Sequence, residues 1–167
     1  MMLGLSLSAF TLLHVIISLV AIAAGLIVIF AMLRNGNPPG WVALFLVTTI
    51  LTSVTGFMFP LKAIGPPHIV GAISLVVLAL ALLALYGRGL AGAWRWVYVV
   101  TSILALYLNV FVAVVQAFQK LAPFRQLAPT QTEPPFAIAQ LLVLMLFIAF
   151  GYFAVKRFHP AALRPAM

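Results

Sequence analysis

The chain has 167 residues, of which 66% are hydrophobic and 6% are charged. Its mean hydropathy of +1.27 lies far above that of soluble domains, so the sequence predicts a membrane protein. Nine lysines and arginines stand against a single acid, Glu133, and there is no cysteine. Paired catalytic carboxylates, carboxylate cages for Ca²⁺ or Mg²⁺, thiolate nucleophiles and zinc sites with cysteine ligands are therefore excluded.

Five apolar stretches are each close to the ~20 residues that a helix needs to cross the hydrocarbon of a bilayer. In chain order they cover residues 7–33, 41–59, 68–86, 94–118 and 136–155. They are apolar on all sides rather than alternating, which excludes a transmembrane β-barrel. We therefore expect an all-α fold, in which residues 1–167 form one domain, a polytopic bundle of five transmembrane helices with the termini on opposite sides of the membrane.

Proline pairs mark the predicted helix boundaries. Three of the five stretches begin just after Pro38-Pro39, Pro66-Pro67 and Pro134-Pro135. Proline suits the first turn of a helix, because the backbone donors there have no partner within the helix and its φ is already helical. The glycine at Gly36 is expected to end the first helix. The longest connection, residues 119–135, holds four prolines and is predicted to be an extended loop.

The basic residues predict the orientation of the bundle, because loops rich in lysine and arginine stay in the cytoplasm. One end of the bundle carries six basic residues and the other carries three. The six are Arg34, Arg88, Arg95, Lys156, Arg157 and Arg164, and the three are Lys62, Lys120 and Arg125. This bias predicts the N-terminus outside and the C-terminus inside. Because these charges are scattered singly at helix ends, they indicate anchoring at lipid headgroups and no nucleic-acid partner.

Polar side chains gather in the half of the predicted bundle nearest the N-terminus, which is the outer half in this orientation. Four of the five helices carry an imidazole or a carboxamide there, whereas the other half is nearly pure hydrocarbon. The polar residues of the outer half are His14, Ser18, Thr48, Thr49, Thr52, Ser53, Thr55, His68, Ser74, Asn109, Gln116, Gln119 and Gln140. We expect the hydroxyl groups to bond to carbonyls of their own helices.

Helical spacing predicts which way these side chains face. One stripe of small and polar residues runs along the first helix and another along the fourth. The stripes comprise His14, Ser18, Ala21 and Gly25, and Ser102, Asn109 and Gln116. Such stripes should face the interior, since small residues let helices approach closely and polar residues find partners only there. Large apolar side chains are then expected to face lipid.

Five residues are candidates for ligand binding: His14, His68, Asn109, Gln116 and Gln140. His14 lies roughly 10 Å below the outer surface at ~1.5 Å per residue, and an ionisable group at that depth is a candidate functional residue. His14 and His68 together have the right chemistry for the axial ligands of a b-type haem, or for copper. Each also has a plain structural interpretation, as a packed hydrogen-bonding residue or as a residue at the wet interface.

Two classes of function remain open from the residues alone. The first is a non-enzymatic binding or accessory component with a polar pocket in the outer leaflet, with the bilayer, other membrane proteins or a second copy as partners. The second is an electron-transfer protein that binds haem b through His14 and His68, or a quinone through His14, Asn109 or Gln140. A secondary transporter or a serine hydrolase fits less well, because the chain shows neither two similar halves nor a GxSxG motif.

The single acid, Glu133, lies in the predicted outer loop near three basic residues. These are Lys62, Lys120 and Arg125. The simplest interpretation is a surface ion pair, which contributes under ~1 kcal/mol to stability. The functional alternative is a lone carboxylate that arranges the mouth of an outer pocket.

Three blocks of the sequence carry a resemblance. They are LTSVTGFMFP at residues 51–60, GPPH at residues 65–68 and LAPTQTEPPF at residues 127–136. These blocks resemble those of small uncharacterised inner-membrane proteins of proteobacteria, and the likeness extends over most of the chain. The resemblance implies a multi-pass protein of the bacterial inner membrane and brings no activity with it.

Overall fold

The computed structural model describes residues 6–59 and 66–160. Within these ranges the chain forms α1 (Leu7–Leu33), α2 (Pro39–Phe57), α3 (Pro66–Leu82), the π-helical turn η1 (Leu83–Gly87), α4 (Trp94–Lys120), α5 (Ala122–Leu127) and α6 (Pro134–Arg157). Five helical segments are long and apolar enough to cross a membrane, with α3 and η1 acting as one segment, His68–Gly87. The prediction of an all-α bundle with five candidate membrane spans is confirmed.

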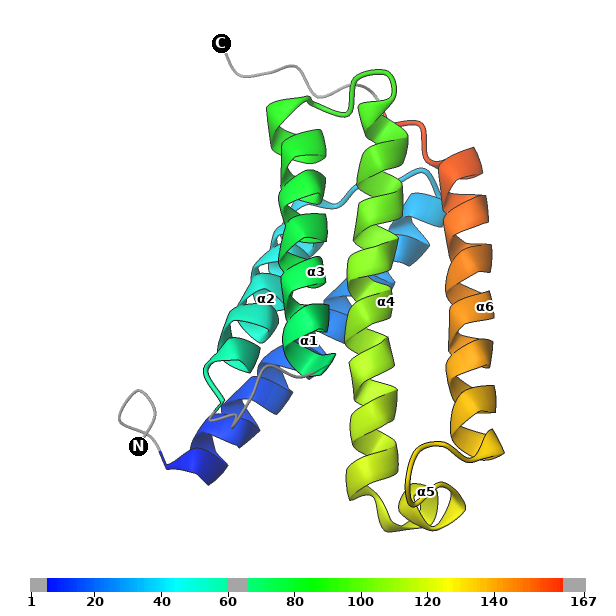
Figure 1. The fold of residues 1–167 in the computed structure, drawn as a ribbon. Helices are drawn as coiled ribbons and strands as arrows, with labels where there is room; N and C mark the ends of the chain where they lie inside the picture. The colour runs from blue at the N-terminus through cyan, green and yellow to red at the C-terminus, as the bar shows by residue number, and fades with distance from the viewer. Residues whose placement is uncertain (1–5, 60–65, 161–167) are drawn as a thin grey trace.

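Helix α4 is the central helix of the bundle, because it packs against α1, α3 and α6 and, over a shorter stretch, against α2. Figure 1 shows α3, α4 and α6 standing side by side with α1 crossing behind them. Helix α1 begins beside the end of α2 and finishes beside the end of α6. We call the end of the bundle that holds α5 the α5 end, which lies at the bottom of Figure 1.

The proline pairs start helices as predicted. Helices α2, α3 and α6 begin at Pro39, Pro66 and Pro134, each a member of one pair. At the end of α1, Asn35 adopts the left-handed conformation at φ 62°, one residue before Gly36, which was expected to end the helix. The Gly36 amide donates to the Ala31 carbonyl at 2.7 Å, which closes the last turn of the helix.

The prediction of an extended loop over residues 119–135 is wrong, because this connection contains the short helix α5. Pro123 occupies its first turn, where a missing N–H is harmless. The Phe124 ring of α5 packs against Phe118 of α4 at a centroid distance of 5.3 Å, and Phe118 also meets Phe136 of α6 at 5.3 Å. These aromatic contacts supply tertiary support that local sequence does not reveal.

The buried core lies in the half of the bundle away from α5. Its members include Met32 of α1, Phe45 of α2 and Tyr98 of α4, which are all fully buried. The closest approach is at Gly25 of α1, where an added Cβ would lie 2.6 Å from Leu106 Cδ1. Gly25 and Ala21 are both buried, so this part of the predicted stripe does face the interior.

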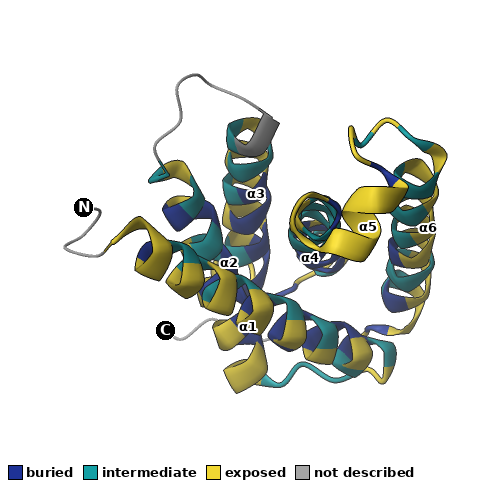
Figure 2. Ribbon diagram, turned by 90° about the horizontal axis from the view of Figure 1, so that it is seen from below, coloured by how far each residue is buried: buried dark blue, intermediate teal, exposed yellow. Residues whose placement is uncertain are grey.

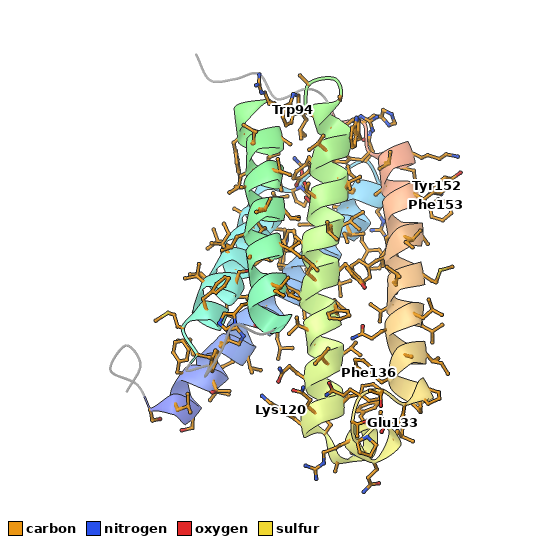
Figure 3. The ribbon with its side chains drawn as sticks, viewed as in Figure 1. Trp94, Lys120, Glu133, Phe136, Tyr152 and Phe153 are labelled. Carbon is orange, nitrogen blue, oxygen red and sulfur yellow. The ribbon has the colours of Figure 1, made fainter. Side chains whose placement is uncertain are left out.

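Helix α6 lies at the edge of the bundle, and among the described helices it packs mainly against α4 and α1. Only 11% of the residues in its most apolar stretch are buried inside the bundle. Its outer face exposes large apolar side chains, including Leu142 at 66% and Met145 at 59%. Tyr152 and Phe153 also point away from the bundle (Figure 3). This surface has the composition that lipid contact requires.

The basic residues of the described chain keep the predicted bias between the two ends. Arg34, Arg88, Arg95, Lys156 and Arg157 belong to the end away from α5, whereas Lys120 and Arg125 belong to the α5 end. Lys62 and Arg164 lie outside the described residues. The side of the membrane on which each end lies stays a prediction.

The predicted ion pair of Glu133 with Lys120 or Arg125 is wrong, and Lys62 lies outside the described residues. The Glu133 carboxylate instead accepts hydrogen bonds from the Thr130 hydroxyl at 2.9 Å and from the Thr132 amide at 3.1 Å. A slight loss of hydration acts to raise the pKa of Glu133, but the bonds from Thr130 and Thr132 outweigh it and hold that pKa below its ordinary value. Glu133 thus orders the turn before α6 (Figure 3).

Candidate functional site

A cavity of about 860 Å³ lies between α1, α2, α3 and α4 in the half of the bundle nearest α5. Its walls come from the first half of α1, the last turns of α2, the start of α3 and the last turns of α4. Figure 2 looks at the bundle from the α5 end and shows these four helices beside one another, with α6 outside the group. The polar side chains of the wall are Thr11, His14, Ser18, Thr52, Ser53, Ser74, Asn109, Gln116 and Lys120.

The rest of the wall is apolar, and it includes two aromatic rings from the end of α2. These residues are Leu7, Val15, Leu19, Ile22, Gly56, Phe57, Phe59, Val70, Gly71, Leu108, Val112, Ala113, Ala117 and Leu121. Predominantly apolar walls with a few placed polar groups are typical of sites that bind small molecules, and such sites usually have volumes of roughly 300–1,000 Å³. The cavity therefore has the composition and the size of a ligand site.

His14 is held by α2. Its Nδ1 atom lies 2.7 Å from Thr55 Oγ1, and Thr55 Oγ1 lies 2.6 Å from the Leu51 carbonyl oxygen. A hydroxyl has one proton, and the approach to a carbonyl oxygen at that distance requires it. Thr55 therefore donates to Leu51 and accepts from the Nδ1–H of His14. In this neutral tautomer Nε2 carries the lone pair, and it has no hydrogen-bond partner among the described residues.

Asn109 is oriented in the same way from the opposite wall. Its Nδ2 atom donates to Thr49 Oγ1 at 3.3 Å, and the Thr49 hydroxyl donates to the Phe45 carbonyl at 2.7 Å. The Thr49 proton is thus already used, so the amide nitrogen of Asn109 must face Thr49 and its carbonyl oxygen must face away. This oxygen has no hydrogen-bond partner within the described ranges.

Three hydroxyl groups of the wall, those of Thr11, Ser18 and Thr52, bond to their own helices, as the sequence predicted. Ser18 donates to the His14 carbonyl at 2.7 Å, and Thr52 donates to the Thr48 carbonyl at 2.9 Å. Thr11 donates to the carbonyl four residues before it at 2.8 Å. Each hydroxyl oxygen can still accept a further hydrogen bond, although its proton is no longer free for a ligand.

Gln116 and Lys120 line the cavity at the last turns of α4, and both side chains are exposed. Lys120 is the one charged residue among the described residues of the wall. It stands at the α5 end of α4 (Figure 3). The charge therefore lies toward the end of the cavity, while His14 and Asn109 lie deeper along the helices.

Three of the five candidate binding residues, His14, Asn109 and Gln116, lie in the wall of this one cavity. His68 and Gln140 are not among its lining residues. The structure therefore brings together residues that the sequence placed on two separate helices. Their role in binding stays a prediction.

His68 and Gln140 make other contacts. The His68 ring at the start of α3 lies 5.7 Å from the Phe57 ring of α2, centroid to centroid. Gln140 Nε2 donates to the Phe111 carbonyl of α4 at 3.2 Å, so this amide joins α6 to the centre of the bundle. The Gln140 Oε1 atom is buried without a hydrogen-bond partner in the described part of the chain.

The described residues give limited support to a metal site or a haem site. Across residues 6–59 and 66–160, no three histidine, cysteine or acidic side chains lie together as a metal site would need. A haem with two axial imidazoles requires only a pair. Both imidazoles would have to project into one space, and of the two predicted ligands only His14 lines the cavity.

The sequence pattern did not reveal the second role of two threonines. Thr49 and Thr55 donate to carbonyls of their own helix, as expected. Each also accepts a hydrogen bond from a cavity residue on another helix. Lys120 was expected only to anchor a helix end at the lipid headgroups, and it also lines the cavity. The sequence feature that could have revealed these bonds is the run of hydroxyl residues on the late turns of α2, which lies in the same half of the bundle as His14 and Asn109.

No protein-family model, curated protein or solved structure matches the chain. No family or homologue is therefore identified, and the class of protein is defined by the fold itself. The five long apolar helices make this an integral, multi-pass membrane protein that associates with a lipid bilayer.

Proposed function

We propose that the protein is a non-enzymatic binding component whose ligand is a small, amphipathic, lipid-soluble molecule held in the cavity. One observation carries the proposal: His14 Nε2 and Asn109 Oδ1 are left unpaired by the described residues in a cavity of about 860 Å³ whose walls are mostly apolar. An unpaired polar atom in apolar surroundings is unfavourable, so a ligand that pairs with these atoms is bound more tightly than one that does not.

The test is the extraction of bound amphiphiles from protein purified in a mild detergent. Wild-type protein is expected to carry one amphiphile in stoichiometric amount, and Asn109→Leu is expected to lose it. Gln140→Leu is the matched control, because it makes the same change from amide to leucine at a residue that bonds to α4 outside the cavity. This control should keep the amphiphile.

Two outcomes would contradict the proposed function. In the first, wild-type protein carries only the mixture of lipids that Asn109→Leu also carries. In the second, Gln140→Leu loses the amphiphile as completely as Asn109→Leu does. A second cavity variant, Ala113→Phe, guards against a misleading folding defect in Asn109→Leu. It adds a ring that fills the cavity from its wall without removing a hydrogen bond, so it should also lose the amphiphile.

The alternative function is electron transfer with haem b or a quinone. Its specific support is the Thr55 bond to His14 Nδ1, since ligating histidines commonly have their second ring nitrogen fixed in this way. A quinone is a small, amphipathic, lipid-soluble molecule and so belongs to the class of ligand proposed above. Haem b would be a different ligand, and its presence would contradict that proposal. A Soret band in protein purified from haem-replete cells, lost in His14→Ala, is the result that favours haem.

We also propose that the α5 end faces the periplasm of a bacterial inner membrane. The support is the excess of basic residues at the other end of the described chain. Because the chain has no cysteine, single variants can be labelled cleanly. Gln126→Cys in α5 should react with an impermeant maleimide in cells with a permeabilised outer membrane, and Ala91→Cys should react only after lysis. The reverse pattern would overturn the orientation.

A further inference from the structure

The deep polar groups of the cavity offer mainly hydrogen-bond acceptors to a ligand. His14 uses its Nδ1–H on Thr55, and Asn109 uses an amide hydrogen on Thr49. Ser18 and Thr52 use their hydroxyl protons on carbonyls of their own helices. What these four side chains still offer a ligand is the Nε2 lone pair of His14, the carbonyl oxygen and the second amide hydrogen of Asn109, and the lone pairs of the two hydroxyl oxygens.

This character is fixed by the backbone of α2. Two relays run from the cavity wall into α2, one from His14 through Thr55 to the Leu51 carbonyl and one from Asn109 through Thr49 to the Phe45 carbonyl. A carbonyl oxygen has no proton to give, so neither relay can reverse. Both side chains must therefore present an acceptor to anything that occupies the cavity.

Aromatic rings stand beside these acceptors. The Phe59 ring meets the His14 ring edge to face at a centroid distance of 5.2 Å, and Phe57 lines the same part of the cavity. Aromatic side chains favour edge-to-face or offset contacts with further rings. The surroundings of His14 thus suit a flat ring that carries a hydrogen-bond donor.

We propose that the ligand has an aromatic head group with a donating hydroxyl, a phenol or a hydroquinone, attached to an apolar tail. This inference rests on the proposed function and names the chemical class of its ligand. The hydroxyl donates to His14 Nε2 or to Asn109 Oδ1, and the tail lies along the apolar wall. An oxidised quinone, which offers only carbonyl oxygens to these acceptors, binds more weakly than its hydroquinone.

The experiment compares nonylphenol with nonylanisole by calorimetry on the full chain in detergent micelles, with empty micelles as the baseline. The methyl ether keeps the ring and the tail but removes the donor. We expect nonylphenol to bind about tenfold more tightly, the ratio for about one buried hydrogen bond. Undecanol, which has the donor without the ring, should also bind more weakly than nonylphenol.

Thr55→Val tests the role of the relay. The variant keeps the shape of the side chain but frees His14 Nδ1, so the preference for nonylphenol over nonylanisole should fall. Thr101→Val is the matched control, because Thr101 donates to the carbonyls four and three residues before it, as Thr55 does, but lies in the packed half of the bundle. This control should keep the full preference.

The outcomes separate this inference from the proposed function. If no probe binds above the empty micelle, the proposed function fails. If nonylanisole binds as tightly as nonylphenol and Asn109→Leu abolishes both, the cavity binds amphiphiles but the donor requirement is wrong. Equal binding of undecanol and nonylphenol overturns the aromatic head, and an equal loss of preference in Thr55→Val and Thr101→Val overturns the relay.

Discussion

Gly25→Ala is expected to destabilise the bundle by about 1–3 kcal/mol, the range for overpacking a closed core. The added Cβ would lie 2.6 Å from Leu106 Cδ1 and 2.9 Å from the Phe45 ring. Both neighbours are fully buried, so neither side chain has room to retreat without a shift of backbone. Helix α1 would have to move away from α2 and α4. Reversible unfolding in mixed micelles measures the change in free energy.

Gly151→Ala in α6 is the matched control for this prediction. It makes the same change within a helix, but the added Cβ would meet its nearest neighbour, Ile103, at 4.0 Å, an ordinary contact distance. Replacing a helical glycine by alanine alone stabilises by roughly 0.5–1 kcal/mol, so Gly151→Ala should be neutral or slightly stabilising. Equal stability of the two variants would show that α1 does not depend on close contact at Gly25.

The contact at Gly25 also matters for the cavity. Helix α1 is one rigid element, and its half near α5 forms a wall of the cavity through His14 and Ser18. The packed half fixes the distance between α1 and α4, and this distance sets the width of the cavity along its length. Close packing at one end of α1 therefore supports an open space with polar groups in its wall at the other end.

The spans were predictable because their signals are local. Residues 7–33 match α1 at both ends, since Ser6 caps the start of the helix and the apolar run stops at Arg34. The proline pairs located the starts of α2, α3 and α6. Helix α5 was not predictable, because six residues are too few to form a stable helix alone, and its packing through Phe124 on Phe118, which in turn meets Phe136 of α6, exists only in the folded chain.

The sequence placed the candidate site in the half of the bundle that holds the cavity, and it could predict no more than that. Asn109 and Gln140 are amides at similar depth, yet one lines the cavity and the other bonds to the α4 backbone. The difference arises because α4 is central and α6 is at the edge, and the order of helices around a bundle cannot be read from hydropathy. The hydrogen-bond direction at His14 was also beyond the sequence, since it requires the distance from Thr55 to the Leu51 carbonyl.

Arg95→Met is expected to loosen the end of α6, with a loss of about 1.5–3 kcal/mol, the range for hydrogen bonds made by a charged group. The Arg95 Nη1 atom of α4 donates to the Val155 carbonyl at 3.0 Å and to the Phe158 carbonyl at 2.5 Å. The last carbonyls of a helix have no partner within the helix, so this side chain stabilises an end that is otherwise unsatisfied. Methionine keeps the apolar stem but removes every donor.

Hydrogen exchange of the amides in the last turns of α6 is the measurement that isolates this effect, because α6 is the least buried of the five spans and has few other contacts with the bundle. Arg88→Met is the matched control: Arg88 lies over the Trp94 ring at 5.2 Å, and the described residues give it no bond to α6. Exchange near Val155 should accelerate in Arg95→Met and stay unchanged in Arg88→Met. Equal exchange in the two variants would mean that the bonds from Arg95 do not hold the end of α6 in place.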